Sequence, residues 1–465
     1  MKRRTKIVCT LGPAVASESK IKELVSAGMN VARLNCSHGD WASKAEMVGW
    51  IKKCESQCGR VAILADLQGP KFRIGKFADN SITLTTGQSI TVGHGDVTIP
   101  VPYGEIWDAM SNGARLLLGD GEVEIKLGVK KDEVYDAKVV TGGLVKSRQG
   151  VTLVGKSFDV PCLTTQDLMD IEEAVKLGVD FIALSYVRRA SDMRELRRIV
   201  ERLDPSVHLV SKIETKEALK DLEEIVKLSD AVMVARGDLG LQMDIEDVPA
   251  AQRRIIMVCN RAGKPVITAT QMLESMVVNA RPTRAEATDV ANAILQGTDA
   301  VMLSGETAAG AYPVEAVKVM SRIAEKTDPF VRLSEDLENI HESNKETHTD
   351  AVAHAAVSIS ESLKAKAVVT TTTSGATPKV VSKYRPRAPI YCTCWHERVQ
   401  RHLALVWGVE AILSDPPLNT DDSIAKAVDS FLRHKRLKVG DLVVVTAGVP
   451  AGRPGNTNMI LVQHV

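Results

Sequence analysis

Two apolar stretches of the chain end abruptly in charged residues. The stretch HLVSKIE ends in Lys212 and Glu214, and the stretch VMVARGDLG runs into Arg236 and Asp238. A short apolar run that stops at a polar turn is typical of a buried strand. Two neighbouring strands of this kind would bring a lysine, an arginine and two carboxylates together. Carboxylate oxygens suit a hard metal ion and the cations suit an anionic substrate, so the pattern predicts a metal site beside an anion.

Strand-like runs alternate with segments of helical spacing along much of the chain. Eight strand–helix units in series predict a (β/α)8 barrel of the TIM type. The predicted strands are Ile7–Leu11, Val31–Leu34, Val61–Ala65, Phe181–Ser185, His208–Lys212, Ala231–Val234, Val266–Ala269 and Ala300–Leu303. Among the predicted helices, Ser19–Ala27, Thr165–Leu177 and Asp247–Ala262 each precede a glycine that can form a left-handed cap, namely Gly28, Gly178 and Gly263.

The barrel pattern is interrupted once and followed by a further domain. Residues 68–152 show alternating β patterns with glycines between them, which predicts a small β-barrel domain inserted after the third strand. Such an insert would lie over the active-site face of the barrel as a lid. After a polar linker, residues 333–465 have the pattern of an open α/β sheet. We therefore expect an α/β protein in which residues 1–67 and 153–332 form the barrel.

Composition excludes some classes of function. Basic and acidic residues number 59 and 58, so overall charge gives no reason to expect a nucleic-acid or membrane partner. No apolar run approaches the roughly 18 residues of a membrane-spanning helix. The run Ile7–Leu11 leads into Gly12 and Pro13, which indicates a strand and a turn instead of a signal peptide. We expect a cytoplasmic protein.

Polar residues recur at the ends of the predicted barrel strands. In a barrel enzyme the functional residues lie at the carboxyl ends of the strands. Polar groups concentrated at these ends are hard to explain as a solvated surface. Those after the second strand are Arg33, Asn35, Ser37 and His38; those after the third are Asp66, Gln68, Lys71 and Arg73; those after the last two are Thr268 to Gln271 and Ser304 to Glu306.

These stretches together resemble the pyruvate kinase family over essentially the whole chain. The motifs are TKIVCTLGPA, ARLNCSHGD, ADLQGPKFRIG, SKIET, VMVARGDLG, TATQMLESM, RPTRAEATDVANAILQGTDAVMLSGETA and AYPVEAV. The resemblance implies transfer of the phosphoryl group of phosphoenolpyruvate to ADP, giving pyruvate and ATP, with Mg2+ or Mn2+. It also implies a homotetramer.

The resemblance assigns roles to individual residues. Lys212 is similar to the family's catalytic lysine, and Glu214 and Asp238 would hold the metal. The alternative for these carboxylates is an ordinary salt bridge to Lys212 or Arg236. Further catalytic or substrate-binding roles fall on Arg33, Thr270, Gly237 and Asp238, and nucleotide-binding roles on Asn35, Ser37, His38 and Arg73. Glu306 is left open between a site role and a structural ion pair.

One departure from the commoner family pattern concerns K+. The resemblance implies a monovalent-cation region at Asn35, Ser37, Asp66 and the carbonyl of Leu67. Where many members have a glutamate, this chain has Lys71. A built-in ammonium would replace the cation, so the chain resembles the potassium-independent branch and K+ is not expected to be required. The alternative is that Lys71 points to solvent.

Two further loops carry open assignments. The lid sequence Ser147–Gly150 lacks an expected lysine, so Arg148 is a candidate substitute for nucleotide contact and Gln149 is not assigned. A Ser/Thr-rich loop before a predicted helix is similar to the family's effector loop, with AMP or a sugar phosphate as possible effectors, although a plain turn explains it equally well. Its candidate residues are Thr371, Thr372, Thr373, Ser374, Gly375 and Thr377.

Two other functions remain alternatives. A barrel aldolase or lyase acting on a keto acid would use Lys212 as a Schiff-base lysine. A non-catalytic sensor of phosphorylated metabolites would use the C-terminal loop.

Overall fold

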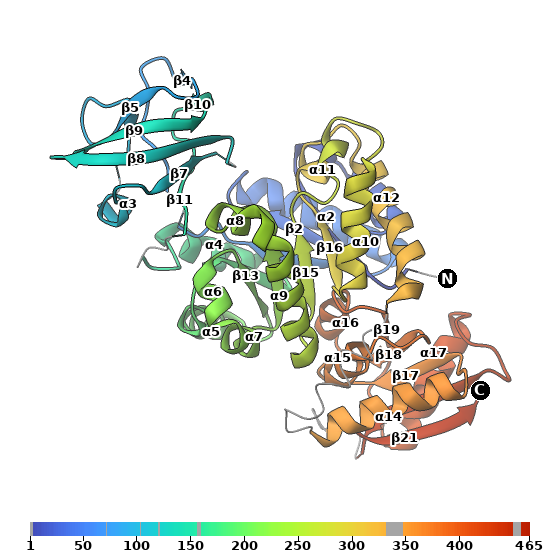
Figure 1. Ribbon diagram of the computed structural model, residues 1–465. Coiled ribbons are helices and arrows are strands. Elements are labelled where there is room, and N and C mark those ends of the chain that lie inside the picture. The colour runs from blue at the N-terminus through green and yellow to red at the C-terminus, as the bar shows by residue number, and fades with distance from the viewer. Residues whose placement is uncertain are drawn as a thin grey trace.

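A closed barrel of parallel strands forms the centre of the molecule (Figure 1). The computed structural model describes residues 3–70, 72–102, 104–119, 121–155, 160–331, 347–449 and 457–465. Within these ranges eight strands close the barrel in the order β1-β16-β15-β14-β13-β12-β3-β2. Their bounds are β1 (Lys6–Thr10), β2 (Val31–Asn35), β3 (Ala62–Asp66), β12 (Phe181–Val187), β13 (His208–Ile213), β14 (Ala231–Ala235), β15 (Val266–Ala269) and β16 (Ala300–Leu303).

The barrel strands are mainly apolar because both of their faces are covered. All five residues of β14 and all five of β3 are buried, including Asp66 at the end of β3. A parallel strand with side chains packed inside the barrel and helices outside has no solvated face, so its sequence is a continuous apolar run. Asn35 lies level with Asp66 in the strand register.

Helices surround the barrel. They are α1 (Glu18–Ala27), α2 (Trp41–Cys58), α4 (Thr165–Leu177), α5 (Ala190–Leu203), α6 (Lys216–Lys220), α7 (Leu222–Leu228), α8 (Arg236–Gln242), α9 (Val248–Ala262), α10 (Arg284–Leu295), α11 (Gly305–Ala308) and α12 (Pro313–Thr327), with short 3-10 turns η1 (Pro13–Val15), η2 (Ile245–Asp247), η3 (Glu274–Val277) and η4 (Asp328–Phe330). Gly178 and Gly263 end their helices in the left-handed conformation as expected. Gly28 also has positive φ, but at 127° it lies outside the left-handed helical region.

The insert after β3 is β-rich and lies at one end of the barrel (Figure 1). Its described strands form a six-stranded sheet, β11-β7-β8-β9-β5-β6, and a separate pair, β10-β4, instead of one sheet closed by hydrogen bonds. It has its own apolar core, which includes Val92, Trp107 and Leu118. Its elements are β4 (Ser81–Leu84), β5 (Ser89–Gly93), β6 (Ile99–Pro100), α3 (Gly104–Ala109), β7 (Arg115–Leu118), β8 (Val123–Lys131), β9 (Val134–Thr141), β10 (Gly143–Lys146) and β11 (Val151–Leu153).

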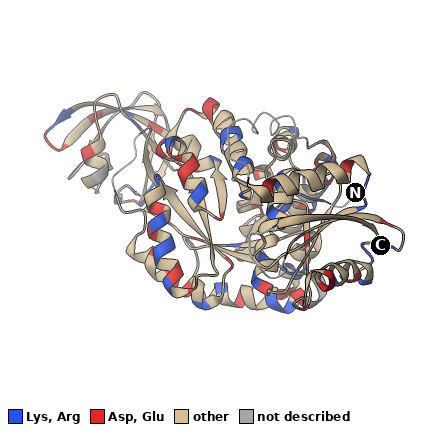
Figure 2. Ribbon diagram, turned by 90° about the horizontal axis from the view of Figure 1, so that it is seen from below, with Lys and Arg blue, Asp and Glu red and all other residues tan. Residues whose placement is uncertain are grey.

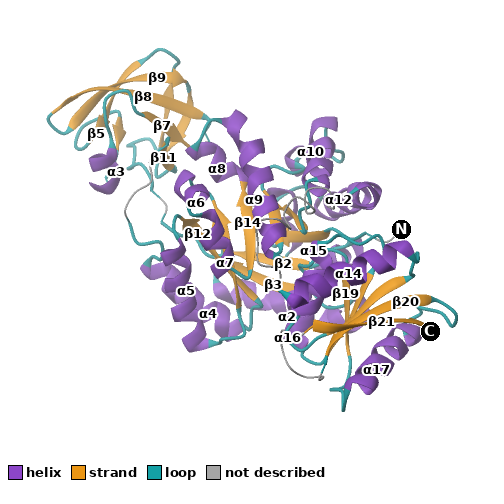
Figure 3. Ribbon diagram, turned by 60° about the horizontal axis from the view of Figure 1, so that its bottom comes forward, coloured by secondary structure: helices purple, strands orange, loops and turns teal. Residues whose placement is uncertain are grey.

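The C-terminal part lies at the other end of the barrel and contains a five-stranded sheet with helices on both faces (Figures 1 and 3). The sheet order is β19-β18-β17-β20-β21, and β21 alone among these strands is antiparallel to its neighbour. The sequence patterns predict strands at Ala367–Val369, Ile390–Cys392 and Asp441–Thr446, which correspond to β17, β18 and β20, and they miss β19 and β21. The elements are α14 (His348–Ser362), β17 (Ala367–Thr371), α15 (Ala376–Lys383), β18 (Ile390–Cys394), α16 (Glu397–Leu403), β19 (Val409–Leu413), α17 (Thr420–Arg433), β20 (Leu442–Gly448) and β21 (Thr457–His464).

A buried polar junction joins the barrel to the C-terminal part. The guanidinium of Arg385 lies 3.1 Å from Asp299 Oδ2, with both side chains at most 4% exposed. The other oxygen of Asp299 accepts from the backbone N–H of Trp407. A hydrogen-bonded buried ion pair specifies one docking geometry more strongly than apolar contact does.

Two general properties agree with the composition. Figure 2 shows basic and acidic residues interspersed along the helices, and their numbers nearly balance to a net charge of +1. Within the described ranges, no helix has the length and hydrophobicity that crossing a membrane requires.

Candidate active site

A cleft of about 370 Å³ opens where the carboxyl ends of the barrel strands meet the insert. It brings together most of the site residues that the sequence predicts. Those lining it are Arg33, Asn35, Ser37, His38, Asp66, Leu67, Arg73, Lys212, Glu214 and Asp238. Thr270 is not part of the lining, and Lys71 lies outside the described residues.

Lys212 is the centre of the polar network in this cleft. Its Nζ lies 2.8 Å from Glu214 Oε1 and donates to the Ser185 hydroxyl at 2.5 Å. Asp66 Oδ1 lies 3.2 Å from the same nitrogen, as an ion pair without good hydrogen-bond geometry. Burial would lower the pKa of Lys212, but the carboxylates of Asp66, Glu214 and Asp238 outweigh it and raise that pKa. The surrounding carboxylates therefore favour the charged form of this buried side chain.

Asp66 holds a second cation beside the first. Its Oδ2 accepts from Arg33 Nε at 2.6 Å, and Arg33 also donates to the Thr10 hydroxyl. Burial would raise the pKa of Asp66, but Lys212 and Arg33 outweigh it and lower that pKa. The ionised Asp66 thus fixes a lysine and an arginine side by side, which suits a multiply charged anion.

Glu214 and Asp238 form an acidic pair that fits a hard cation. Glu214 Oε2 accepts from the backbone N–H of Tyr186 at 2.7 Å. Burial and the neighbouring charge of Asp238 raise the pKa of Glu214, against the opposing effect of Lys212. A divalent cation would relieve this repulsion, and carboxylate oxygens are ligands it accepts. No cluster of three or more metal-ligating side chains occurs in the described part of the chain, so substrate and water oxygens would complete such a site.

The salt-bridge alternative holds for one of these carboxylates only. Glu214 pairs with Lys212, whereas Arg236 pairs with Asp289 at 2.6 Å and is absent from the cleft lining. The expected grouping of Arg236 with Asp238 is therefore wrong. Both residues belong to α8, and positions two apart on a helix point in nearly opposite directions because each residue turns by about 100°.

A hydrogen bond to the backbone of α8 connects Thr270 to the site. Its Oγ1 accepts from the Gly237 N–H at 2.8 Å and donates to the Ala269 carbonyl at 2.7 Å. Glu306, left open between a site role and a structural ion pair, binds backbone N–H groups in this structure. Its fully buried carboxylate accepts from the backbone N–H groups of Leu273 and Ser304.

The predicted nucleotide-binding residues come from two parts of the cleft: Asn35, Ser37 and His38 from the end of β2 and the turn after it, and Arg73 from the insert. The side-chain nitrogen Nδ2 of Asn35 lies 3.3 Å from Nδ1 of His38, and Asn35 Oδ1 accepts from the Ser37 N–H. Arg73 Nη1 donates to the Arg148 carbonyl at 3.0 Å. Gln149 is held within the insert, because its Oε1 accepts from the Lys146 N–H.

Ser185 and Tyr186 are cleft residues that the sequence reasoning missed. Ser185 Oγ donates to the Leu67 carbonyl at 2.7 Å while it accepts from Lys212, so it connects the end of β3 to the lysine. Tyr186 has φ 59° at an irregularity of β12. The available signal was position: Ser185 ends the fourth predicted strand, as Lys212 ends the fifth.

The candidate effector loop lies in the C-terminal part, between β17 and α15, and not in the cleft. Thr372 Oγ1 accepts from the Gly375 N–H, and the hydroxyls of Thr377 and Thr457 lie 2.7 Å apart. Gly375 has φ 86°, which explains a glycine at the start of the helix.

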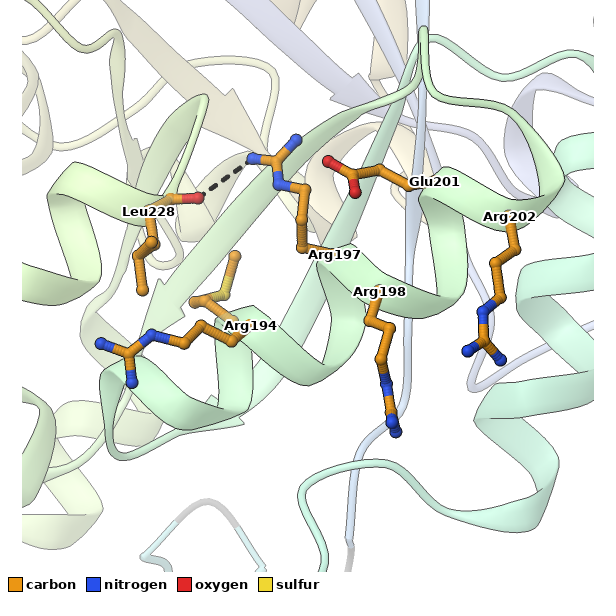
Figure 4. A pocket seen from close by; sticks show the side chains of 7 residues that line it. Arg194, Arg197, Arg198, Glu201, Arg202 and Leu228 are labelled. Atoms are coloured by element: carbon orange, nitrogen blue, oxygen red, sulfur yellow. Dashed lines mark hydrogen bonds between the residues drawn. The ribbon is translucent and has the colours of Figure 1, made fainter.

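A second hollow of about 400 Å³ lies on the outside of the barrel between α5 and α7 (Figure 4). Four arginines of α5 surround it, and one of them, Arg197, donates to the Leu228 carbonyl and to Asp230. It carries neither a carboxylate pair nor a lysine, and it lies on the helical layer away from the strand ends. The cleft around Lys212 is the better candidate active site.

A (β/α)8 barrel whose strand ends hold a buried lysine, an arginine and paired carboxylates defines an enzyme acting on a phosphorylated or similarly charged substrate. Comparison with known proteins identifies the family. Sequence models described as "Pyruvate kinase, barrel domain" and "Pyruvate kinase, alpha/beta domain" match residues 2–317 and 350–463. The chain belongs to the pyruvate kinase family of phosphotransferases.

Individual relatives match along the whole chain. The pyruvate kinase of Geobacillus stearothermophilus is 45% identical over 474 residues, covering 100% of this chain and 81% of that protein. The pyruvate kinase of Corynebacterium glutamicum is 44% identical over 470 residues, covering 100% of this chain and 98% of that protein.

Proposed function

We propose that the cleft around Lys212 transfers the phosphoryl group of phosphoenolpyruvate to ADP, giving pyruvate and ATP. The observation that carries the proposal is the convergence of Lys212, Arg33 and the carboxylates of Glu214 and Asp238 in one cleft of a pyruvate kinase barrel.

The two cations would bind and stabilise the phosphoryl group. Arg33 offers a planar guanidinium to the substrate phosphate, and the Lys212 ammonium lies beside it through their shared partner Asp66. The transition state of phosphoryl transfer spreads negative charge over the equatorial oxygens. A buried cation whose pKa is raised stabilises that charge without reorganisation.

Glu214 and Asp238 would hold Mg2+ or Mn2+, which when bound neutralises charge on the substrate oxygens. Thr270 would then belong to the hydroxyl and water chain that protonates the enolate left by phosphoryl transfer. Asn35, Ser37, His38 and Arg73 would contact the nucleotide, and Arg73 is anchored on the Arg148 carbonyl.

Several finer properties belong to the same proposal. K+ is not required, because Lys71 replaces the cation near Asn35, Ser37, Asp66 and Leu67. Residues 1–67 and 153–332 form the barrel domain, residues 68–152 the inserted lid domain and residues 333–465 the C-terminal domain. The protein acts in the cytoplasm as a homotetramer. It binds AMP or a sugar phosphate at Thr371–Gly375 and Thr377.

The raised pKa of Lys212 argues against the aldolase alternative. A Schiff-base lysine must lose its proton before it attacks a carbonyl, and the surrounding carboxylates favour the charged form. The sensor alternative leaves the network in the barrel cleft without a purpose.

The direct test is pyruvate formation from phosphoenolpyruvate and ADP by the full chain, after removal of divalent metal by EDTA and after its return. We expect activity that disappears with the metal and returns with Mg2+. Equal activity without divalent metal would contradict the metal assignment, and no ATP formation in any condition would contradict the function.

A further inference from the structure

The turn that carries Thr270 has an unusual backbone. Thr270 has φ 67° and Gln271 has φ 52°, so two consecutive residues with side chains adopt the left-handed conformation. A β-branched residue such as threonine rarely occupies this region, and surrounding contacts must hold it there.

The Arg236 guanidinium supplies those contacts. Its Nε lies 3.2 Å from the carbonyl oxygens of both Ala269 and Thr270, and its Nη2 donates to Thr270 at 2.6 Å and to Gln271 at 3.2 Å. One planar fork thus binds three successive carbonyls of the turn. A lysine has a single nitrogen and could not reproduce this pattern.

The far side of the guanidinium is fixed as well. Nη1 lies 2.6 Å from Asp289 Oδ2 and 3.4 Å from Gln252 Oε1. The Arg236 side chain is only 10% exposed and does not line the cleft, so it is not placed to contact a substrate.

Gly237, the residue after Arg236, binds the side-chain hydroxyl of Thr270. The N–H of Gly237 donates to Thr270 Oγ1 at 2.8 Å, and a Cβ at Gly237 would lie 3.4 Å from that oxygen. Arg236 therefore fixes the backbone of the turn while Gly237 orients its hydroxyl, and Asp238 completes the same helical turn at the metal site.

We propose that Arg236 is a positioning residue for the proton-transfer half of the reaction. The inference rests on the proposed function: phosphoryl transfer breaks the P–O bond of phosphoenolpyruvate, forms a new P–O bond to the terminal phosphate of ADP and leaves an enolate. C3 of this enolate then forms a C–H bond with a proton drawn from solvent through the Thr270 hydroxyl chain. Arg236 fixes where that hydroxyl lies. Phosphoryl transfer depends on Lys212, Arg33 and the metal that Glu214 and Asp238 would hold, whereas the Arg236 guanidinium binds the Thr270 turn and Asp289.

The test separates the two halves of the reaction in the full-length enzyme. Protonation is measured in reverse, as exchange of the methyl hydrogens of pyruvate with D2O in the presence of Mg2+. Phosphoryl transfer is measured as ATP formed in a single turnover from phosphoenolpyruvate and ADP. Arg236→Lys is compared with Arg254→Lys, the same change at a half-exposed arginine on α9 whose nearest carboxylate, Glu223, lies 3.7 Å away.

We expect Arg236→Lys to slow hydrogen exchange by about 100-fold, since a displacement of about 1 Å costs that much, while single-turnover ATP formation changes less than about 5-fold. Arg254→Lys should change neither. Loss of both rates in equal proportion, or unchanged exchange, would overturn the inference and assign Arg236 a structural role only.

A second variant keeps the test decisive if Arg236→Lys does not fold. Asp289→Asn keeps the Arg236 guanidinium but weakens the ion pair that holds it. Hydrogen exchange should therefore fall by about 3- to 10-fold, again with a smaller effect on single-turnover ATP formation. Equal loss of both rates in this variant would also overturn the inference. A wild-type enzyme that forms no ATP would instead refute the proposed function.

Discussion

The Nζ of Lys212 lies 2.5 Å from the hydroxyl oxygen of Ser185. That hydroxyl in turn donates to the Leu67 carbonyl, so its lone pair is directed at the ammonium. We predict that Ser185→Ala lowers kcat by about 10- to 100-fold, because the lysine loses the neutral partner that orients it. The measurement is steady-state pyruvate formation with saturating phosphoenolpyruvate and ADP.

Ser211→Ala is the matched control for this variant. Ser211 is a fully buried serine on β13, and its hydroxyl accepts from Ser229 at 2.9 Å. Loss of this hydroxyl should reduce thermal stability and leave kcat within about 2-fold, since the hydroxyl bonds to Ser229 outside the cleft. Equal loss of activity in the two variants would mean that Ser185 matters only for packing.

Removal of either carboxylate of the acidic pair should weaken metal binding. We expect Glu214→Gln and Asp238→Asn each to raise the dissociation constant of Mn2+ at least about 100-fold, because each removes a charged oxygen ligand. Binding is measured directly by calorimetry or by the electron paramagnetic resonance of free Mn2+, without an activity assay.

Asp244→Asn controls for the general loss of negative charge near the cleft. Asp244 is a half-exposed residue that reaches Arg115 of the insert at 3.4 Å. Its replacement should leave Mn2+ binding within about 2-fold. Unchanged Mn2+ affinity in Glu214→Gln and Asp238→Asn would place the metal elsewhere.

A stacked histidine pair should make stability depend on pH. The rings of His208 and His402 lie 3.4 Å apart between the barrel and α16. Burial lowers the pKa of each to about 2, with further lowering by Lys379, Arg398 and, for His402, by His208. Below pH 6.5 the two histidines bind protons in the unfolded chain but stay neutral in the folded chain. The free energy of unfolding should therefore fall by up to about 1.4 kcal/mol per pH unit for each histidine.

The measurement is the denaturation midpoint between pH 7.5 and pH 5, for the wild type and for His402→Phe. Above pH 6.5 the histidines contribute no slope. Burial raises the pKa of Asp180 to about 6. On acidification Asp180 therefore binds its proton in the folded state at a higher pH than in the unfolded state, which opposes the loss of stability caused by the histidines. The difference between the two proteins isolates His402, and the variant should lose less stability on acidification. Parallel curves would show that His402 binds its proton in the folded state.

The proposed potassium independence would depend on Lys71. We expect full activity when tetramethylammonium replaces K+, and we expect Lys71→Glu to acquire a requirement for K+ because the built-in cation is gone. Activity is measured at constant ionic strength with each cation. Strong activation of the wild type by K+ would contradict the assignment and would favour a solvent-facing Lys71.

The sequence was sufficient for the barrel because its strands have no solvated face. Runs such as Ala231–Val234 are apolar throughout, and the charged residues that follow them mark the strand ends. The same reasoning located Arg33, Asp66, Lys212, Glu214 and Asp238 around one cleft.

Side-chain direction after a strand end could not be read from spacing. Arg236 and Asp238 follow the same strand, yet α8 begins immediately and turns the arginine towards Asp289. Ser185 was missed because its importance comes from two long-range partners, Leu67 and Lys212, that no local pattern contains. In the C-terminal part, β21 is an edge strand in which only Thr457 is buried, so no buried face marks it in the sequence.

The most direct measurement is the turnover of Lys212→Met with phosphoenolpyruvate, ADP and saturating Mg2+, beside Lys264→Met. Lys264 is a partly buried lysine at the opposite ends of the strands, where its Nζ donates to the Ser229 carbonyl at 2.5 Å. In the proposed site Mg2+ and Arg33 would compensate the carboxylates that Lys212→Met leaves behind. Circular dichroism checks that the variant is folded. We predict that Lys212→Met lowers kcat by at least about 1,000-fold while Lys264→Met stays within about 3-fold of the wild type. A folded Lys212→Met enzyme with near-normal kcat would contradict the account.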